Sequence, residues 1–202
     1  MVITIQSQLY KGGNHMADRK IGVLVGSLRK DSFSRKVAKE LMKLVPPAYQ
    51  MEEVEIGELT IYNQDLDDEN NPPSTWTTFR EQMQKFDAVL FVTPEYNRSV
   101  PAVIKNAIDI GSRPYGKSIW DGKPGAVVSV SPGGLSGFGA NHHLRQSLVF
   151  VNIPTMQQPE AYIGNAMALF DDSGAFTSER THDFLQKFVD AFAIWIEANI
   201  RK

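Results

Sequence analysis

The sequence predicts an α/β fold, a doubly wound five-stranded parallel sheet with helices on both faces. The first observation behind this prediction is that short apolar runs alternate along the chain with longer amphipathic segments. Strands that are followed by covering helices have this pattern. The second observation is the composition of the runs, which are almost continuously aliphatic. Parallel strands that are buried on both faces have this composition.

The positions of these runs predict the elements in order. The first strand is expected from Ile21 to Val25, and Gly26 then allows a tight turn into the first helix. The acidic stretch over residues 63–73 contains two adjacent prolines and is expected to be a solvated surface loop. The remaining patterns predict a strand over 51–56, a helix over 74–85, a strand over 87–93, a helix over 102–110, a strand over 125–130, a helix from about 140, a short strand over 153–156 and a C-terminal helix over 178–200.

The turn after the first strand has the residue types of a phosphate-binding site. Ser27, Ser32 and Ser34 can donate hydroxyl hydrogen bonds, and Ser32 or Ser34 can also cap the helix that follows. Arg29 adds a permanent positive charge, and the free N–H groups of a helix N-terminus favour an anion. Taken alone, the segment is equally compatible with an ordinary serine-capped turn that carries a solvated arginine.

Motifs that are missing narrow the choice of phosphate ligand. The Walker pattern Gly-x4-Gly-Lys-Ser/Thr does not occur, which argues against a nucleotide triphosphatase. No Gly-x-Gly-x-x-Gly follows the first strand, and the glycines within residues 133–139 come after a later strand with a different spacing. The sequence therefore favours the phosphate of a mononucleotide.

Three loops are expected to meet at one edge of the sheet. In a doubly wound sheet, ligands bind at the carboxyl ends of the strands, where the strand order reverses. The loops over 26–34, 94–100 and 131–139 follow the first, third and fourth predicted strands. The first loop would take the phosphate, while the other two offer backbone groups, Tyr96 and Asn97 to a flat heterocycle.

The composition excludes several functions. The 202 residues carry a formal net charge of -2, which gives no electrostatic reason to expect nucleic acid or an anionic membrane as a partner. No apolar run approaches the ~20 residues of a membrane span, and a cytoplasmic protein is expected. Cysteine is absent, which removes disulfides, thiol nucleophiles and thiolate metal sites. Any redox chemistry must come from a bound cofactor.

Two local features are not expected to carry chemistry. Residues 1–15 are expected to be an expression leader that precedes a single domain over 16–202, and the alternative is a native arm with an edge strand. His142 and His143 are adjacent, so on a helix they point about 100° apart and cannot both ligate one metal ion from one face. No metal site is expected.

Four motifs stand out in the chain, namely Gly26-Ser-Leu-Arg-Lys-Asp-Ser-Phe-Ser-Arg, Thr93-Pro-Glu-Tyr-Asn97, Pro101-x4-Lys105-Asn-Ala-Ile-Asp109 and Ser131-Pro-Gly-Gly134. Together they resemble the NADPH-dependent FMN reductase family, and in particular its chromate and quinone reductase branch. The resemblance extends from about Lys20 to the C-terminal helix. It implies a flavodoxin-like fold, noncovalently bound FMN, NADPH or NADH as co-substrate, and a homodimer or homotetramer.

The resemblance also implies roles for single residues. Ser27, Arg29, Ser32 and Ser34 would hold the FMN phosphate, although many relatives have asparagine where this chain has Ser34. Arg113 could reach the active site of a partner subunit and contact substrate there, and Asn97 could contact substrate as well as the cofactor. The residues that would line the isoalloxazine ring are Pro94, Glu95, Tyr96 and Asn97 on one side and Ser131, Gly133 and Gly134 at its far edge.

The implied function is that of an FMN-dependent NAD(P)H oxidoreductase that reduces quinones, with chromate and azo compounds as further candidate acceptors. Hydride would pass from NAD(P)H to the flavin, and a small-molecule acceptor would then replace the nicotinamide, which is a ping-pong scheme without a general base. One alternative is a flavodoxin-like electron carrier or FMN-binding module without NAD(P)H activity of its own. Another is a regulatory protein that binds FMN without turnover.

Overall fold

The computed structural model describes residues 18–201 and builds one parallel sheet from five strands. The strand order is β2-β1-β3-β4-β5, which is the flavodoxin-like doubly wound order with its reversal between β1 and β3. The predicted fold class is therefore confirmed, whereas the expected leader over residues 1–15 lies outside the described residues. The strands are β1 (Arg19–Val25), β2 (Tyr49–Glu53), β3 (Ala88–Thr93), β4 (Gly125–Val130) and β5 (Ala161–Ile163).

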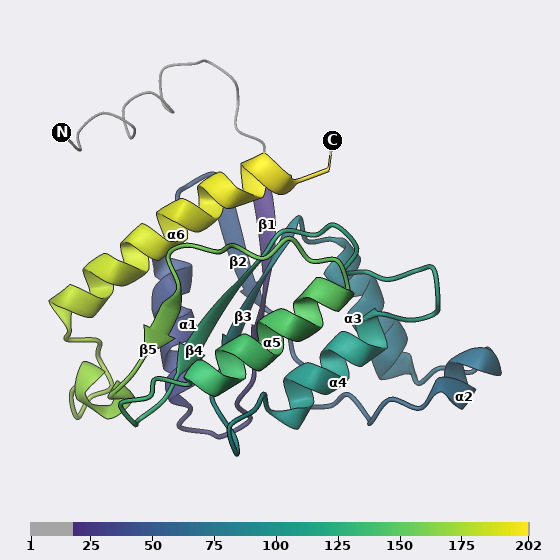
Figure 1. Cartoon of the computed structure of the whole chain (residues 1–202), viewed down its shortest axis with the longest axis horizontal. Coiled ribbons are helices and arrows are strands. Elements are labelled where there is room, and N and C mark those ends of the chain that lie inside the picture. The colour runs from purple at the N-terminus through teal and green to yellow at the C-terminus, as the bar shows by residue number, and fades with distance from the viewer. Residues whose placement is uncertain (1–17, 202) are drawn as a thin grey trace.

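Helices cover both faces of the sheet (Figure 1). Helices α1 (Phe33–Lys43) and α6 (Glu179–Asn199) pack on one face. The opposite face is covered by α3 (Ser74–Gln84), α4 (Ala102–Gly111) and α5 (Phe138–Phe150). Two short elements, α2 (Gln64–Asp68) and the 3-10 turn η1 (Ala166–Leu169), lie within connections.

Successive strand residues supply the two halves of the core. Val23 and Val25 of β1 pack in the cluster with α1 and α6, while Leu24 between them packs with α3, α4 and α5. This is the two-residue period of a strand whose two faces are both covered. All six residues of β3 are buried, and this burial makes the centre of the sheet a rigid base for the loops that follow its strands.

The fifth strand was predicted wrongly. The sequence favours residues 153–156, whereas the structure forms β5 later, from Ala161 to Ile163. Ile153 and Met156 are buried, but the segment pairs with β4 only through an isolated bridge between Gly125 and Thr155. Burial alone therefore accounts for the apolar pattern, because an apolar side chain can fill the core without its backbone joining the ladder.

The acidic stretch is not wholly a solvated loop. It contains α2, and although Asp65 and Asp68 are exposed, Asp67 is buried. The Asp67 carboxylate accepts two hydrogen bonds, of 2.8 and 2.7 Å, from the guanidinium of Arg80. The Arg80 Nε in turn donates to the carbonyl of Ile110 at 2.9 Å. One buried ion pair thus anchors the acidic stretch over residues 63–73 to α3 and to the end of α4.

None of the helices within residues 18–201 combines the length and apolar character that crossing a membrane demands.

Candidate functional site

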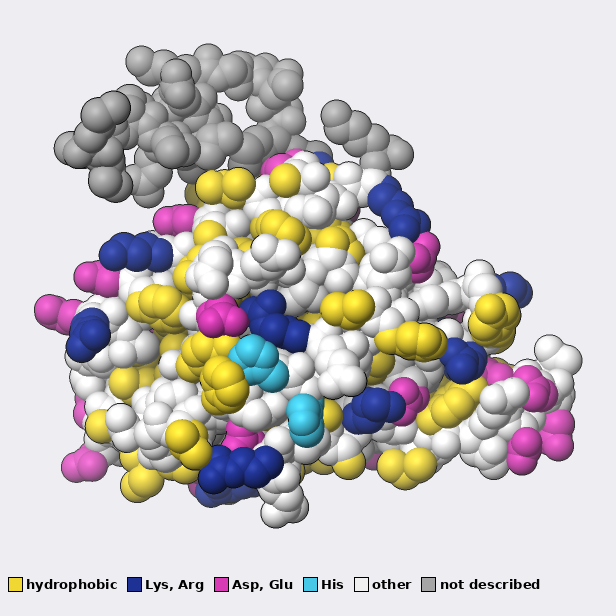
Figure 2. Space-filling model, viewed as in Figure 1, with side chains coloured by type: hydrophobic (Ala, Val, Ile, Leu, Met, Phe, Trp, Pro, Cys, Tyr) yellow, Lys and Arg dark blue, Asp and Glu magenta, His cyan; other side chains and the backbone are white. Residues whose placement is uncertain are grey.

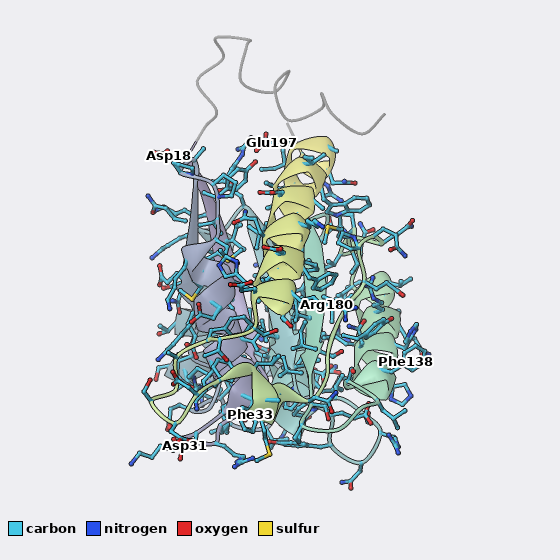
Figure 3. The ribbon with its side chains drawn as sticks, turned by 90° about the vertical axis from the view of Figure 1, so that its left-hand side faces the viewer. Asp18, Asp31, Phe33, Phe138, Arg180 and Glu197 are labelled. Carbon is cyan, nitrogen blue, oxygen red and sulfur yellow. The ribbon has the colours of Figure 1, made fainter. Side chains whose placement is uncertain are left out.

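Three loops converge at the carboxyl edge of the sheet, as predicted. They are the loops after β1, β3 and β4, and in Figure 1 they lie at the end of the sheet away from the chain termini. Figure 3 shows Asp31 and Phe33 of the first loop and helix at this end and Phe138 of α5 in the same lower half of the view, while Asp18 and Glu197 lie at the opposite end. The parallel register and the strand order explain the convergence.

The first loop combines three largely buried serines with an open helix N-terminus. Ser32 is the N-cap of α1, and its Oγ accepts the N–H of Arg35 at 3.1 Å. Ser27 and Ser34 are also largely buried, but their hydroxyl oxygens remain open to solvent, because Tyr62 Oη is the only buried side-chain polar atom without a partner within residues 18–201. Arg29 is exposed at the tip of the loop.

These features fit a phosphate group. Serine hydroxyls without protein partners can donate hydrogen bonds to phosphate oxygens. The first N–H groups of α1, at Phe33 and Ser34, have no intrahelical acceptor and point out of the helix end. A phosphate at this end would satisfy the two serines and the two amides together, and Arg29 could complement its charge.

The second loop is a tight two-residue hairpin. The N–H of Tyr96 donates to the carbonyl of Ser99 at 3.0 Å, and the N–H of Ser99 donates back to Tyr96 at 3.0 Å. The central residues are left-handed, with φ of 50° at Asn97 and 65° at Arg98, as a type I′ turn requires. The turn leaves the Tyr96 ring 44% exposed, beside the edge where the three loops meet.

Glu95 differs from its neighbours because its side chain is directed to α5. Its carboxylate is nearly buried, with Oε2 accepting the N–H of Ala140 at 3.1 Å and Oε1 accepting from Arg98 Nη1 at 3.0 Å. Pro94, Glu95, Tyr96 and Asn97 thus remain together on one loop. The Glu95 carboxylate, however, is engaged by other parts of the protein.

The third loop is anchored by backbone bonds to the end of β5. The N–H of Ser131 donates to Ile163 at 2.9 Å, its carbonyl accepts from Ala166 at 3.1 Å, and its Oγ accepts the N–H of Gly133 at 3.1 Å. Gly133 and Gly134 are exposed, and a Cβ on Gly134 would meet no atom within 4 Å. The predicted ring-contacting segment is therefore fixed at its base and open at its tip.

Arg113 does not lie with these loops. It follows the C-terminal end of α4, whose ten residues span about 15 Å from the carboxyl edge of the sheet. There it borders a groove of about 710 Å³ between α4 and α5, together with His143 and Phe150. Within its own subunit, Arg113 is thus separated from the other predicted site residues by the length of α4.

An aromatic cluster beside the third loop was missed by the sequence analysis. The Phe138 ring is 54% exposed and lies 4.2 Å from the His142 ring, centroid to centroid. His142 Nε2 lies 3.1 Å from the Tyr162 hydroxyl, and burial together with Glu160 raises the pKa of Tyr162 to about 12. The available signal was an aromatic residue directly after a glycine-rich turn.

The two adjacent histidines have separate partners. His142 contacts Tyr162, whereas His143 Nδ1 lies 3.0 Å from the hydroxyl of Ser99. Within residues 18–201, no group of three or more metal-ligating side chains is positioned to hold an ion.

Comparisons with known proteins identify the family of this chain. The model of a family described as NADPH-dependent FMN reductase matches residues 19–168. A quinone reductase of Pseudomonas putida KT2440 is 59% identical over 179 residues, which cover 89% of this chain and 95% of that protein. A 2-hydroxy-1,4-benzoquinone reductase of a Burkholderia species is 44% identical over 177 residues, with 88% and 96% covered.

A solved structure is similar over nearly the whole chain. The flavoenzyme FerB of Paracoccus denitrificans, described as an NAD(P)H:(acceptor) oxidoreductase, superimposes with a TM-score of 0.84 at 43% sequence identity. The match covers 91% of this chain and 100% of that chain.

Proposed function

This chain belongs to the NADPH-dependent FMN reductase family, and we propose that it is an FMN-dependent NAD(P)H oxidoreductase that reduces quinones. The observation that carries the proposal is the loop after β1, where the solvent-accessible hydroxyls of Ser27 and Ser34 and two helix N–H groups lack protein partners among the described residues. These donors suit one phosphate group, and FMN carries one. The names of the quinone reductase relatives support the choice of acceptor.

Each loop has a defined task in this proposal. Ser27, Ser34 and the N-terminus of α1 bind the phosphate, with Ser32 capping the helix and Arg29 adding charge. Bound FMN supplies hydride exchange between NAD(P)H and the acceptor. Residues 94–97 and 131–134 would flank the ring, and those of their backbone N–H groups that have no acceptor within residues 18–201, such as that of Gly134, could stabilise negative charge.

The side chains at this edge need not transfer protons. Glu95, the acidic residue of the second loop, is bonded to Arg98 and to α5, and the described site contains no acid and base placed as a pair. The residues would instead bind, orient and shield the two substrates, which is the protein's usual contribution when a cofactor carries the chemistry. A nicotinamide donor also agrees with the cytoplasmic location expected from the sequence.

Cofactor and activity can be tested on the purified protein. It should be yellow and should release FMN, not FAD, on denaturation. Under anaerobic conditions NADPH or NADH alone should bleach the visible absorbance, and a benzoquinone should restore it. Chromate and an azo dye are tested in the same way. Failure to bleach unless a second protein is added would favour the electron carrier instead.

The surface over α4 and α5 supports self-association. Apolar side chains are exposed there, including Val149 at 75%, Phe150 at 85% and Tyr115 at 92%, and Figure 2 shows hydrophobic side chains spread over this face. The groove between the helices continues into a second hollow of about 410 Å³ beside Tyr115. We propose a homodimer formed through this surface, which would bring Arg113 to the interface; a homotetramer remains the other expected state.

A further inference from the structure

The loops after β3 and β4 are joined through the first turn of α5. Glu95 lies at the start of the second loop, while Ala140 lies in the helix that directly follows the third loop. The bond from the Ala140 N–H to Glu95 Oε2 is 3.1 Å long. A carboxylate at this position satisfies a free N–H group of the helix and interacts favourably with its dipole.

The contact is close as well as polar. A Cβ on Gly139 would lie 2.9 Å from the carbonyl oxygen of Arg98 and 3.0 Å from Glu95 Oε2, so only glycine lets the hairpin approach the helix this closely. A second link lies one turn further along, where the hydroxyl of Ser99 is 3.0 Å from His143. The hairpin is therefore docked on α5 at both of its ends.

From these contacts we propose that Glu95 is a positioning residue for FMN. By binding the N-terminus of α5, its carboxylate fixes the spacing between the loops 94–101 and 131–137, which hold the flavin ring between them. The inference rests on the proposed function, because it presupposes that FMN binds at this edge. It differs from the role implied by the family resemblance, in which Glu95 itself lines the ring.

The burial of the carboxylate favours the indirect role. The side chain is 11% exposed, and each of its oxygens already accepts a hydrogen bond from the protein. A carboxylate shielded to this degree presents little surface through which it could contact the flavin directly. In this proposal the loop spacing depends on the length of the Glu95 side chain, which brings its acceptor oxygen to the N–H of Ala140. The negative charge contributes less.

Two substitutions separate reach from charge. Glu95→Gln keeps an acceptor oxygen at the same distance but removes the charge, whereas Glu95→Asp keeps the charge but is one methylene too short. Glu95→Asp is expected to weaken FMN binding at least tenfold and Glu95→Gln by no more than about threefold. Arg98→Asn is the matched control, since asparagine tolerates the left-handed backbone and removes only the ion pair. It should change FMN affinity by less than about threefold.

The measurements are FMN titration of the apoprotein by flavin fluorescence, the flavin midpoint potential, and circular dichroism to confirm folding. The proposal is overturned if Glu95→Asp binds FMN like the wild type, or if Glu95→Gln binds FMN as weakly as Glu95→Asp. A raised midpoint potential in Glu95→Gln with unchanged affinity would also overturn it, because the charge would then act on the flavin directly. If the wild-type protein itself fails to bind FMN, the proposed function has failed, and the variants are not needed to show it.

Discussion

Arg29 is the permanently charged residue at the tip of the first loop, and its side chain is exposed there. Replacing it with alanine should weaken FMN binding by ~1.5–3 kcal/mol, the usual range for a hydrogen bond to a charged group. Fluorescence titration of the apoprotein measures this loss. Lys30→Ala is the matched control, because it removes a neighbouring exposed charge to which no role has been assigned. Equal affinities of Arg29→Ala and wild type would contradict the phosphate assignment.

Lys123 should make stability depend on pH. Burial lowers the pKa of its amine to about 8, although Asp87 opposes the shift, and its Nζ donates to the carbonyl of Phe86. Between pH 8 and 10.5 the unfolded chain keeps a proton that the folded chain has lost, so stability rises with pH across this window. Below pH 8 the folded protein carries the full cost of the buried charge, on the order of 3 kcal/mol.

The variant Lys123→Met isolates this effect. Near pH 7 the variant should be more stable than the wild type by the largest margin. This difference in unfolding free energy should shrink as the pH rises towards 10.5, because the wild type gains stability there. Urea unfolding at several pH values measures the difference. Lys85→Met, which changes an exposed lysine, should show no such trend. A constant difference between Lys123→Met and wild type would show that the amine is not held neutral in the folded state.

At the scale of elements, the Asp67–Arg80 pair decides whether α2 stays attached to the fold. The side chains are only 4% and 9% exposed, so removing one partner leaves the other charge buried and uncompensated. Arg80→Met is expected to cost ~3–5 kcal/mol in urea unfolding. The double variant Asp67→Leu with Arg80→Met should recover much of this loss.

An exposed pair on another helix provides the control for this experiment. Lys43 and Glu40 of α1 form an ion pair in which the lysine side chain is 67% exposed, and Lys43→Met should cost less than about 1 kcal/mol. If Arg80→Met cost equally little unfolding free energy, the buried pair would not be what anchors residues 63–73.

The strands that the sequence predicted correctly are those whose apolar residues are both buried and hydrogen-bonded to neighbouring strands. β3 is buried along its whole length and lies between two neighbours, so its apolar run marked a strand correctly. The segment 153–156 is also apolar, but most of it fills the core outside the ladder. Asp67 looked solvated because its partner Arg80 is thirteen residues away on another helix.

In the site, too, features that follow from the strand order could be predicted, whereas contacts between distant elements could not. The three loops were predicted because their place at the strand ends follows from topology alone. The direction of the Glu95 side chain was not predicted, because it depends on where α5 begins relative to β3. Arg113 was expected to reach the active site of a partner subunit, and this stays a prediction, because the length of α4 separates Arg113 only from the loops of its own subunit.

For the whole molecule, the exposed apolar surface over α4 and α5 predicts a dimer. Phe150 is 85% exposed, so Phe150→Glu should leave the folded subunit intact while placing a charge in the proposed interface. Light scattering at micromolar concentration should show a dimer or tetramer for the wild type and a smaller species for this variant. Ile194→Glu, on an exposed part of α6, is the control that should not dissociate it. A monomeric wild-type protein would refute the proposal.

The arrangement of the three loops around one edge also predicts the kinetic scheme. Because the nicotinamide and the acceptor would use the same open edge, they are expected to bind in turn. Initial rates against NADPH at several quinone concentrations should therefore give parallel lines, the mark of a ping-pong scheme. Intersecting lines would indicate a complex in which both substrates are bound together.

Proton transfer by the protein can be tested in the same assay. His142 and His143 contact Tyr162 and Ser99, and neither is needed as an acid or base in this scheme. His142→Ala and His143→Ala should each leave the anaerobic bleaching rate with NADPH within about tenfold of the wild type, because loss of a true general acid or base costs roughly 10²–10⁴-fold. Stopped-flow absorbance measures this first half-reaction apart from acceptor binding. A loss of a hundredfold or more in either variant, with FMN still bound, would mean that the histidine takes part in the chemistry and that the scheme without proton transfer by side chains is wrong.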